Sequence, residues 1–287
     1  MIIRIAANEQ EIEQAIATYW ANEPPAKPSC LATTLAHWLN LFATNPEGFW
    51  IAADDDTRQI VGVASATRRP PQWMLTNFFV LPAYQRQGIG KALLSHAYAT
   101  HDGCERFIVH ASSHPSAQSL YMQFGMYPLP HSIVFRGHPR ELPTILSSVS
   151  AEKHPVAEIL SVLNTFDQAA LGFIRAVDHQ WWDKQGSYFL VRAEDRLVGY
   201  FGVSPTGIIG PVVVSDSRWI AAALGLAIRE QHEISADEHE IFVPGANRAA
   251  LAYVLAHGYR SVEINFLFSS HPIPGLAQVI FHDTDLL

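Results

Sequence analysis

The sequence has no long uncharged apolar run, and no charged and apolar leader opens the chain. A helix that crosses a bilayer needs about 20 apolar residues, so we expect no membrane partner and a cytoplasmic location. Cysteine is also scarce: Cys30 and Cys104 stand without a C-x-x-C spacing. This scarcity excludes a disulfide-based scaffold, and we expect two free thiols in a reducing cytoplasm.

The chain also lacks a basic stripe and any recognisable metal-ligand spacing. Its formal net charge is −8 over 287 residues, which argues against a nucleic-acid partner and fits a cationic or amine partner. Its fourteen histidines form no H-E-x-x-H or similar pattern. We therefore predict no metal site.

What the chain does have is a short strand, a glycine loop and a helix in succession. An apolar run at residues 78–81 stops at Pro82, and a G-x-G follows at residues 88–90. Leu93 and Ala97 then continue a helical apolar pattern. Such a loop directs several backbone N–H groups and the positive end of the helix dipole at one point. The expected ligand is a phosphate or pyrophosphate.

The spacing of this loop excludes two common phosphate motifs. A Walker loop needs a glycine where Gln85 stands and a serine or threonine where Ala92 stands. The dinucleotide fingerprint needs a third glycine at the position of Leu93. A helix that begins with small residues for close packing is the plainer alternative.

The sequence of residues 85–90, Gln-Arg-Gln-Gly-Ile-Gly, resembles the Q/R-x-x-G-x-G/A loop of the GNAT superfamily of acyl-CoA-dependent N-acetyltransferases. The resemblance implies that the backbone of residues 85–91 wraps the pyrophosphate of acetyl-CoA. The resemblance also implies which residues bind acetyl-CoA. They are Phe79, Val80, Gln85, Arg86, Gln87, Gly88, Ile89, Gly90, Lys91, His114 and Tyr121.

Residues 115–127 resemble a second signature of the same family, N-x-x-A-x-x-L-Y-x-x-x-G-F. The matching residues are Ala117, Leu120, Tyr121 and Gly125. His114 replaces the usual asparagine, and Met126 replaces the phenylalanine. The resemblance implies that Tyr121 protonates the departing CoA thiolate, a role that suits a phenol. A core tyrosine on an amphipathic helix is the alternative.

The general base is less clearly marked. Amine acetylation requires that the amine lose a proton, and residues 73–80 carry no carboxylate. Asn77 or Thr76 could hold a water that relays this proton. His110, on the following strand, is a second candidate because imidazole has a suitable pKa. A hydrogen-bonded structural histidine is the alternative reading of His110.

The first half shows the order of elements that GNAT domains use, and the second half repeats it more weakly. In the first half we expect strands at residues 2–6, 48–54, 59–67, 73–81 and 106–112, and helices that begin near residue 8, at about 31–42 and at 114–125. In the second half we expect a strand at 145–150, helices from 156 and before Trp181, a hairpin at 188–203, a strand at 210–214, and a strand and helix at 240–259.

These patterns predict an α/β (α+β) chain of two tandem GNAT folds, each a mixed, mostly antiparallel twisted sheet flanked by helices. We expect domains at residues 1–140 and 141–287, with the linker near 137–143. The second domain has no G-x-G after Val214, and Trp219 fills the corresponding stretch. Val254 stands where the first half has Tyr121. The second half is therefore expected to bind no acetyl-CoA and to serve as a scaffold or as a wall of the acceptor cleft.

Two hypotheses about function follow. One is an N-acetyltransferase that moves an acetyl group from acetyl-CoA to a primary amine of a small molecule. The other is a non-catalytic protein that binds acyl-CoA through the same loop and contacts a partner through its second half. The intact loop together with Tyr121 favours the enzyme. The sequence leaves the acceptor and the oligomeric state open.

Overall fold

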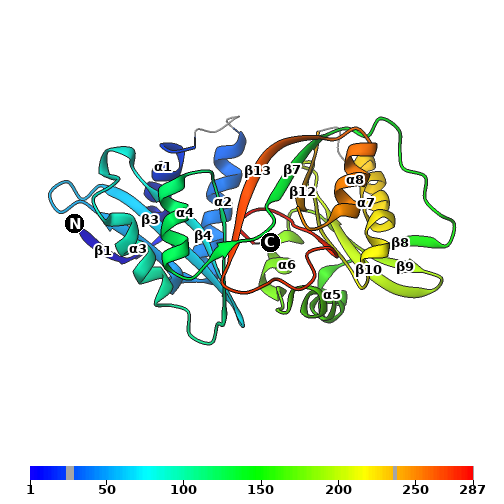
Figure 1. Cartoon of the computed structure of the whole chain (residues 1–287), viewed down its shortest axis with the longest axis horizontal. Coiled ribbons are helices and arrows are strands. Elements are labelled where there is room, and N and C mark those ends of the chain that lie inside the picture. Colours follow the sequence, from blue (N-terminus) through cyan, green and yellow to red (C-terminus); the bar gives the residue numbers. More distant parts are fainter. Residues whose placement is uncertain (24–28, 235–237, 287) are drawn as a thin grey trace. The chain divides into compact units, whose positions relative to one another are not determined.

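A computed structural model describes residues 1–23, 29–234 and 238–286, and its contacts divide the chain into two compact units (Figure 1). The first unit comprises Met1–Val109 and the second comprises His110–Leu287. The predicted domain boundary lies later, between residues 140 and 141. A division by contacts differs from a boundary between sequence repeats, so the repeat boundary remains a prediction.

The first unit holds one sheet with helices around it. Its strands are β1 (Ile2–Ile5), β2 (Phe49–Ala53), β3 (Ile60–Arg69) and β4 (Gln72–Val80), together with β5 (Arg106–Ala111), which ends in the second unit. Its helices are α1 (Glu9–Trp20), α2 (Ser29–Thr44) and α3 (Ile89–Tyr98), with single 3-10 turns η1 (Pro46–Gly48) and η2 (Pro82–Tyr84). Neighbouring strands follow the order of the sequence and are antiparallel, except that β4 and β5 are parallel. The expected mixed, mostly antiparallel sheet is confirmed here.

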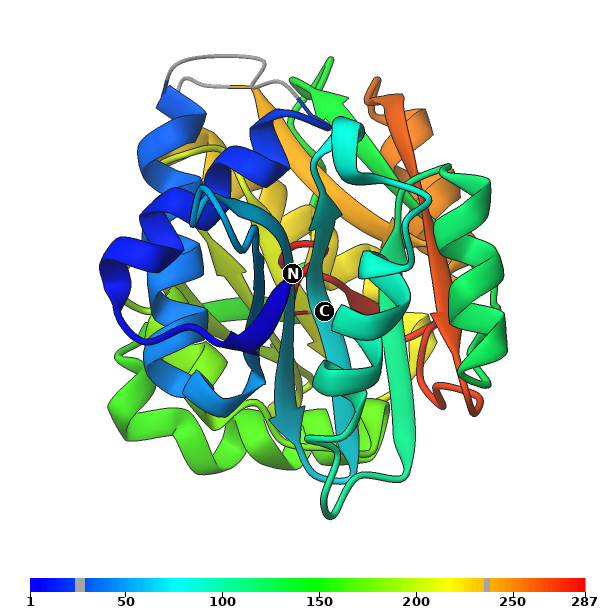
Figure 2. The same cartoon turned by 90° about the vertical axis from the view of Figure 1, so that its left-hand side faces the viewer.

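Helices cover both faces of the sheet in the first unit (Figure 2). The core against α1 and α2 contains Ile12, Trp38 and Val63. On the opposite face, a Cβ built on Gly62 would come within 2.9 Å of Leu93 in α3. Successive residues of a strand point to opposite faces of the sheet. Val63 of β3 therefore faces α1 and α2, whereas Gly62 faces α3. This arrangement holds the start of α3 at the end of β4.

The second unit contains strands of two sheets. One contains β6 (Tyr127–Pro128), β7 (Ser132–Gly137), β12 (His239–Pro244) and β13 (Arg260–Ser269); the other contains β8 (Val149–His154), β9 (Ser187–Ala193), β10 (Arg196–Val203), β11 (Ile209–Val214) and β14 (Val279–Ile280). The helices are α4 (Pro115–Gln123), α5 (Val156–Leu171), α6 (Ala176–Trp182), α7 (Ile220–Ile234) and α8 (Arg248–Ala256), with the 3-10 turn η3 (Ser217–Trp219). The strands that pair within these sheets are antiparallel.

Strand β7 explains why the contact boundary comes before residue 140. It lies between β12 and β13, and it pairs antiparallel with both. Both partners come from the last fifty residues or so of the chain, whereas β7 belongs to the first repeat by sequence. The hydrogen bonds of β7 with β12 and β13 therefore connect the end of the first repeat to the second repeat.

The five-stranded sheet of the second unit separates two kinds of interior. Val191 and Phe201 lie in an apolar core with Leu224 and Ile228 of α7. Tyr200 is the residue before Phe201, so its side chain points to the opposite face of the sheet. Its hydroxyl donates a hydrogen bond to a carboxylate of α5. One side of this sheet is therefore apolar, and the other carries buried polar groups.

One predicted element needs correction, and five elements were not predicted. The strand expected at residues 145–150 begins instead at Val149, where β8 pairs with Ala193, and Ile145 packs on the apolar core from the preceding loop. The prediction omitted β6, β7, β13, β14 and α7. Strand β13 does show period-two alternation, with Val262, Ile264 and Phe266 at every second position. The sequence therefore does contain a signal for this strand.

Candidate active site

The predicted succession of strand, turn and helix is present in β4, the loop after it and α3. Leu81 N–H donates to Val61 O at 2.8 Å, which fixes the end of β4 on β3. The turn η2 follows, and Arg86 and Gly88 then adopt left-handed backbone angles, with φ of 61° and 83°. Gly88 precedes the first helical residue of α3. Glycine suits this position because it alone adopts such angles without steric cost.

The side chain of Gln85 holds the loop in place. Its Nε2 donates to Val80 O and to Asn22 Oδ1, both at 3.0 Å. Asn22 Nδ2 donates to the same Val80 carbonyl at 3.1 Å. Because its amide group is occupied in this way, Gln85 positions the loop through its side chain.

The start of α3 presents amide groups that its own helix does not use. The first turn of an α-helix leaves its leading N–H groups without intrahelical partners, and no side chain among the described residues caps α3. Arg86, Gln87, Gly88 and Lys91 are exposed, whereas Ile89 is buried. The loop therefore offers donors, the positive end of a helix dipole and two cationic side chains to solvent.

The two glycines of the motif have different roles. A Cβ at Gly88 would meet nothing within 4 Å, although its φ disfavours any other residue. A Cβ at Gly90 would approach Phe78 Cζ to 3.2 Å. Gly90 thus permits close packing of α3 on β4, and only Gly88 leaves an open approach to the backbone.

Phe79 and Val80, both predicted to bind acetyl-CoA, lie at the end of β4. The Phe79 ring packs at 5.0 Å from Tyr19 and at 6.5 Å from Trp38. The Val80 carbonyl accepts the hydrogen bonds from Asn22 and Gln85. Both residues therefore join the glycine loop to the core of the first unit, and their contact with a ligand remains a prediction.

Strand β4 carries a bulge close to the predicted water-holding residues. Ser65 pairs with Asn77, while the next residue of β3, Ala66, pairs with Leu75. Thr76 is therefore an extra residue on β4. The bulge brings the polar groups of Ser65, Thr76 and Asn77 together between two apolar stretches.

These three side chains form one hydrogen-bonded cluster. Asn77 is buried, and its Nδ2 donates to Ser65 Oγ at 2.9 Å. The hydroxyl groups of Ser65 and Thr76 lie 2.6 Å apart. Thr76 is partly exposed, so the cluster reaches from the interior toward solvent. Hydroxyl and amide groups of this kind can orient a water molecule.

His110 has the surroundings of a structural histidine. Its Nδ1 donates to Thr284 O at 3.0 Å, and its Nε2 lies 3.2 Å from Ser132 Oγ. Burial lowers the pKa of His110 to about 4. The ring is therefore neutral and weakly basic at pH 7, and a catalytic role for it stays a prediction.

Tyr121 and His114 lie on α4 or at its start. The Tyr121 side chain is 4% exposed and packs against Phe268, with 5.8 Å between ring centroids. Burial raises the pKa of Tyr121 well above its ordinary value, which keeps the phenol protonated and able to donate. His114 is exposed, and its Nδ1 lies 2.9 Å from Ser116 Oγ. The predicted site residues thus fall into two groups, one in each unit.

The corresponding turn of the second unit is built differently. After β11, the Asp216 carboxylate accepts a hydrogen bond from Arg218 N–H at 2.9 Å and caps η3. Trp219 packs against the apolar core, and Ile220 is fully buried. In α8, Val254 is likewise buried in that core. No open amide turn like that at Gly88 exists here.

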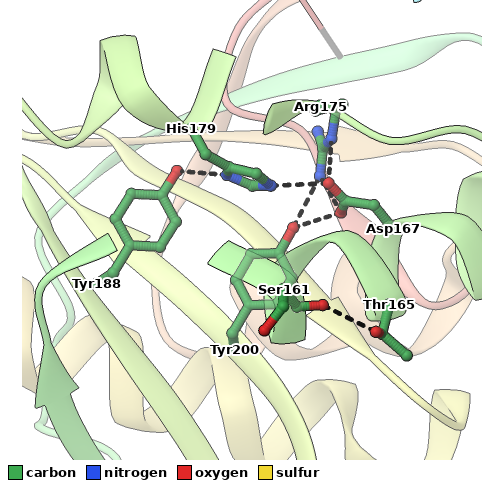
Figure 3. Close-up of polar contacts among 7 residues, drawn as sticks. All are labelled: Ser161, Thr165, Asp167, Arg175, His179, Tyr188 and Tyr200. Carbon is green, nitrogen blue, oxygen red and sulfur yellow. Dashed lines mark hydrogen bonds and ion pairs between the residues drawn. The ribbon is translucent and has the colours of Figure 1, made fainter. Parts of the chain in front are cut away.

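A buried polar cluster in the second unit was missed from the sequence (Figure 3). The Asp167 carboxylate accepts from Arg175 Nη2 at 2.7 Å, from His179 Nε2 at 2.7 Å and from the Tyr200 hydroxyl at 2.5 Å. The Tyr188 hydroxyl lies 3.0 Å from His179 Nδ1. All five side chains are buried. The available signal was a lone carboxylate on the apolar stripe of α5.

The charges of this cluster compensate each other. Burial alone would raise the pKa of Asp167, but Arg175 and the hydrogen bonds of His179 hold it well below its ordinary value. Burial lowers the pKa of His179, which favours the neutral ring. His179 then donates through Nε2 and accepts from Tyr188 through Nδ1. The polar groups shown are mutually satisfied, which indicates a structural role.

The remaining expectations concern metals, thiols and membranes. Within the described ranges, no cluster of His, Cys, Asp or Glu side chains is arranged to hold a metal ion. The Cys104 thiol is buried and unpaired, and it donates to Gln72 O at 3.2 Å. The side chain of Cys30 lies outside the described residues. No described helix has the length and apolarity that a bilayer crossing requires.

Comparison with known proteins gives one family match. Residues 12–126 match the acetyltransferase (GNAT) family. This segment contains the glycine loop and most of the second signature. No curated protein shows significant similarity to the chain.

Several solved structures share the fold over nearly the whole chain. A proposed acetyltransferase from Pyrococcus horikoshii is 20% identical, with a TM-score of 0.74 over 99% of this chain and 92% of that one. A GCN5-related N-acetyltransferase from Sphaerobacter thermophilus is 16% identical, with a TM-score of 0.63 over 96% and 98%. A tandem GNAT protein from the clavulanic acid biosynthesis pathway is 15% identical, with a TM-score of 0.59 over 94% and 98%. These likenesses establish the fold, and the predicted tandem arrangement is confirmed.

Proposed function

We propose that this chain, which belongs to the acetyltransferase (GNAT) family through residues 12–126, transfers an acetyl group from acetyl-CoA to a primary amine of a small molecule. The family supports an acetyltransferase, and the amine acceptor is our inference. The net charge of −8 is compatible with a cationic acceptor.

The observation that carries this proposal is the uncapped start of α3 behind Gly88. Anions bind at helix N-termini because unpaired amides and the helix dipole both favour negative charge. The exposed backbone at Gly88 permits close approach, and Arg86 and Lys91 add positive charge. These features fit the pyrophosphate of acetyl-CoA. Gln85 would keep the loop in shape by its bonds to Val80 and Asn22.

We assign Tyr121 as the hydrogen-bond donor to the departing thiolate. A phenol with a raised pKa remains protonated at neutral pH, so it can donate without first having to gain a proton. His114 stands at the start of the same helix and would contact acetyl-CoA there. We assign the removal of the amine proton to a water held by Asn77 and Thr76, because the pKa of His110 is too low for an efficient base at pH 7.

Calorimetric titration with acetyl-CoA tests the proposal, with two glycine variants as a matched pair. Gly88 and Gly103 have φ of 83° and 76°, and a Cβ at either would meet nothing within 4 Å. Alanine at either position therefore carries a similar backbone cost. We expect one bound acetyl-CoA per chain, at least tenfold weaker binding in Gly88→Ala, and unchanged binding in Gly103→Ala.

Two results would contradict the proposal. Equal affinities in the two variants would remove the glycine loop from the binding site. Tight acetyl-CoA binding without consumption across a library of primary amines would instead support the non-catalytic acyl-CoA-binding alternative. Consumption of acetyl-CoA with one class of amine would identify the acceptor.

A further inference from the structure

The side chain of Asn22 joins the end of α1 to the glycine loop. Asn22 follows the residue that caps α1 at its C-terminus, and its backbone N–H donates to Tyr19 O at 2.9 Å. Its Nδ2 donates to Thr18 O at 2.7 Å, which satisfies one of the carbonyl groups that the last turn of a helix leaves free. The same Nδ2 donates to Val80 O at 3.1 Å. One amide nitrogen therefore connects the end of a helix with the end of β4.

The partners of the two amide groups fix their orientation. Nδ2 of Asn22 faces two carbonyl oxygens, which can only accept, so the donor end of this amide must point at them. Oδ1 of Asn22 accepts from Gln85 Nε2, which also donates to Val80 O. The Val80 carbonyl has two lone pairs and receives one hydrogen bond from each side chain. Asn22, Val80 and Gln85 are thus joined pairwise in a closed hydrogen-bonded triangle.

The loop beside this triangle has a backbone that needs support. Arg86, directly after Gln85, has a left-handed φ of 61°, which is unfavourable for a residue with a Cβ. A backbone of this kind persists only where surrounding contacts hold it. Gln85 supplies such a contact because its side chain is fixed at two points immediately before the strained residue.

The other end of the link is firmly anchored in the first unit. Ile12 and Ile16 of α1 are buried in one core with Val63 of β3. The ring of Tyr19, in the last turn of α1, packs at 5.0 Å from the ring of Phe79 in β4. Asn22 therefore ties the loop to a helix that is itself packed on the sheet.

We propose that Asn22 is a positioning residue for acetyl-CoA binding, which holds Gln85 and Val80 so that the backbone around Gly88 keeps the shape that receives the pyrophosphate. The inference rests on the proposed function and adds to the site a residue that lies outside both sequence signatures. A preformed loop loses less conformational freedom when a ligand binds, so release of this link should weaken the affinity for acetyl-CoA. By linkage, bound acetyl-CoA should in turn reduce local opening at the end of α1.

Calorimetric titration of the full chain with acetyl-CoA tests the inference. Asn22→Ala should raise the Kd of acetyl-CoA about three- to tenfold, because the loop loses its bonds to the end of α1. Asn22→Leu keeps the branched shape of the side chain and removes its hydrogen-bonding atoms, so it should give the same result. It also replaces the alanine variant if that variant does not fold.

Asn45 provides a matched control in the same unit. Like Asn22, it follows the end of a helix, is partly buried and bonds a strand, because its Oδ1 accepts from Arg68 N–H of β3 at 3.2 Å. Asn45→Ala should leave the Kd of acetyl-CoA within about twofold of the unaltered value, since the link that it removes does not involve the loop. Denaturation midpoints of the two alanine variants show whether their stabilities fall by similar amounts.

Two further measurements separate a positioning role from general stabilisation. If Asn22 acts through Gln85, Asn22→Ala should change the Kd by less than about twofold when it is added to Gln85→Leu, whereas independent effects would multiply. Saturating acetyl-CoA should also slow hydrogen exchange of the backbone amides at residues 19–23 in the unaltered chain. This protection should be lost in Asn22→Ala at saturating acetyl-CoA.

The outcomes distinguish this inference from the proposed function. Absence of acetyl-CoA binding in the unaltered protein would refute the proposed function and this inference with it. Acetyl-CoA binding combined with an unchanged Kd in Asn22→Ala and Asn22→Leu would refute only the role of Asn22. Equal weakening in Asn22→Ala and Asn45→Ala, or multiplied effects in the double variant, would likewise overturn that role alone.

Discussion

The two turns that follow β4 and β11 have the same framework and opposite surfaces. In each, a strand ends, a 3-10 turn follows, and a helix begins. The first turn places Gly88 in a left-handed conformation before an uncapped helix. The second places the Asp216 carboxylate on the backbone and buries Ile220. The two turns therefore have the same order of elements, whereas the side chains of the second turn cover its backbone amides.

This difference teaches that the same order of elements can leave backbone amides open or cover them, and that the residues of the turn decide which. A carboxylate at the second turn both occupies an amide donor and repels phosphate. The side chain of Trp219 adds apolar packing where the first loop is exposed. We therefore expect acetyl-CoA at the first turn alone, as proposed above.

Separating the repeats should have the largest effect. In a fragment of residues 1–140, β7 would lose both of its partners, β12 and β13, and would expose two unpaired edges. We expect this fragment to be insoluble or unfolded by gel filtration and circular dichroism. A soluble, monomeric fragment as active as the whole chain would show that the second repeat is an independent module.

Breaking the buried polar cluster should cost the second unit about 3–5 kcal/mol, because Asp167→Asn leaves the Arg175 charge without its partner. For comparison, the layer of helices in the first unit contains aromatic side chains that pack around Trp38. Chemical denaturation measures the loss. Asp195→Asn, at an exposed turn, is the control and should change stability by less than about 0.5 kcal/mol. Equal stability of the two variants would contradict the structural role.

The helices α4 and α8 extend the comparison to the leaving group. Tyr121 of α4 corresponds to Val254 of α8 in the family pattern. We expect Tyr121→Phe to lower kcat by about ten- to a thousandfold with little change in acetyl-CoA affinity, since only the hydroxyl is lost. Steady-state kinetics and calorimetry measure the two effects. An unchanged kcat on a true acceptor would assign Tyr121 to packing alone.

Acid should destabilise the second unit by up to a few kcal/mol. Burial lowers the pKa of His110 and of His239 from 6.5 to about 4 in the folded chain. As pH falls from about 6.5 to 4, the unfolded chain therefore binds protons that the folded chain does not, and stability falls. Hydrogen exchange should show that the backbone amides of residues 110–287 are less protected at pH 5 than at pH 7. His110→Gln should reduce this pH dependence, and equal protection at both pH values would contradict it.

The smallest expected effect concerns the cap of the second turn. Asp216→Ala should lower the stability by about 1 kcal/mol, because the hydrogen bond to Arg218 N–H is lost. Asp216→Asn keeps a capping oxygen and removes only the charge, so it should be nearly neutral. Neither variant should gain an acetyl-CoA site. A second equivalent of acetyl-CoA in calorimetry would show that the carboxylate alone had closed the turn.

The sequence predicted the elements whose signals are local. The strand, glycine loop and helix around Gly88 follow from residues within one short span, and so do the two hairpins and the start of α1 near residue 8. The helix near the end of the chain was also predicted, and the structure shows that Asn247 caps it. Periodicity and turn chemistry act over a few residues, so they can be read without the fold.

Only the tertiary structure decided which distant groups meet. The placement of β7 between β12 and β13, the bonds of Gln85 to Asn22, and the cluster around Asp167 all join residues far apart or on different elements. Strand pairing leaves no mark at the level of one strand, since a period-two pattern is compatible with many partners. Burial, which lowers the pKa of His110, likewise depends on every element packed around it. The resemblance of residues 12–126 to the GNAT family could be read from two short motifs, whereas the surroundings of the polar groups came from the fold.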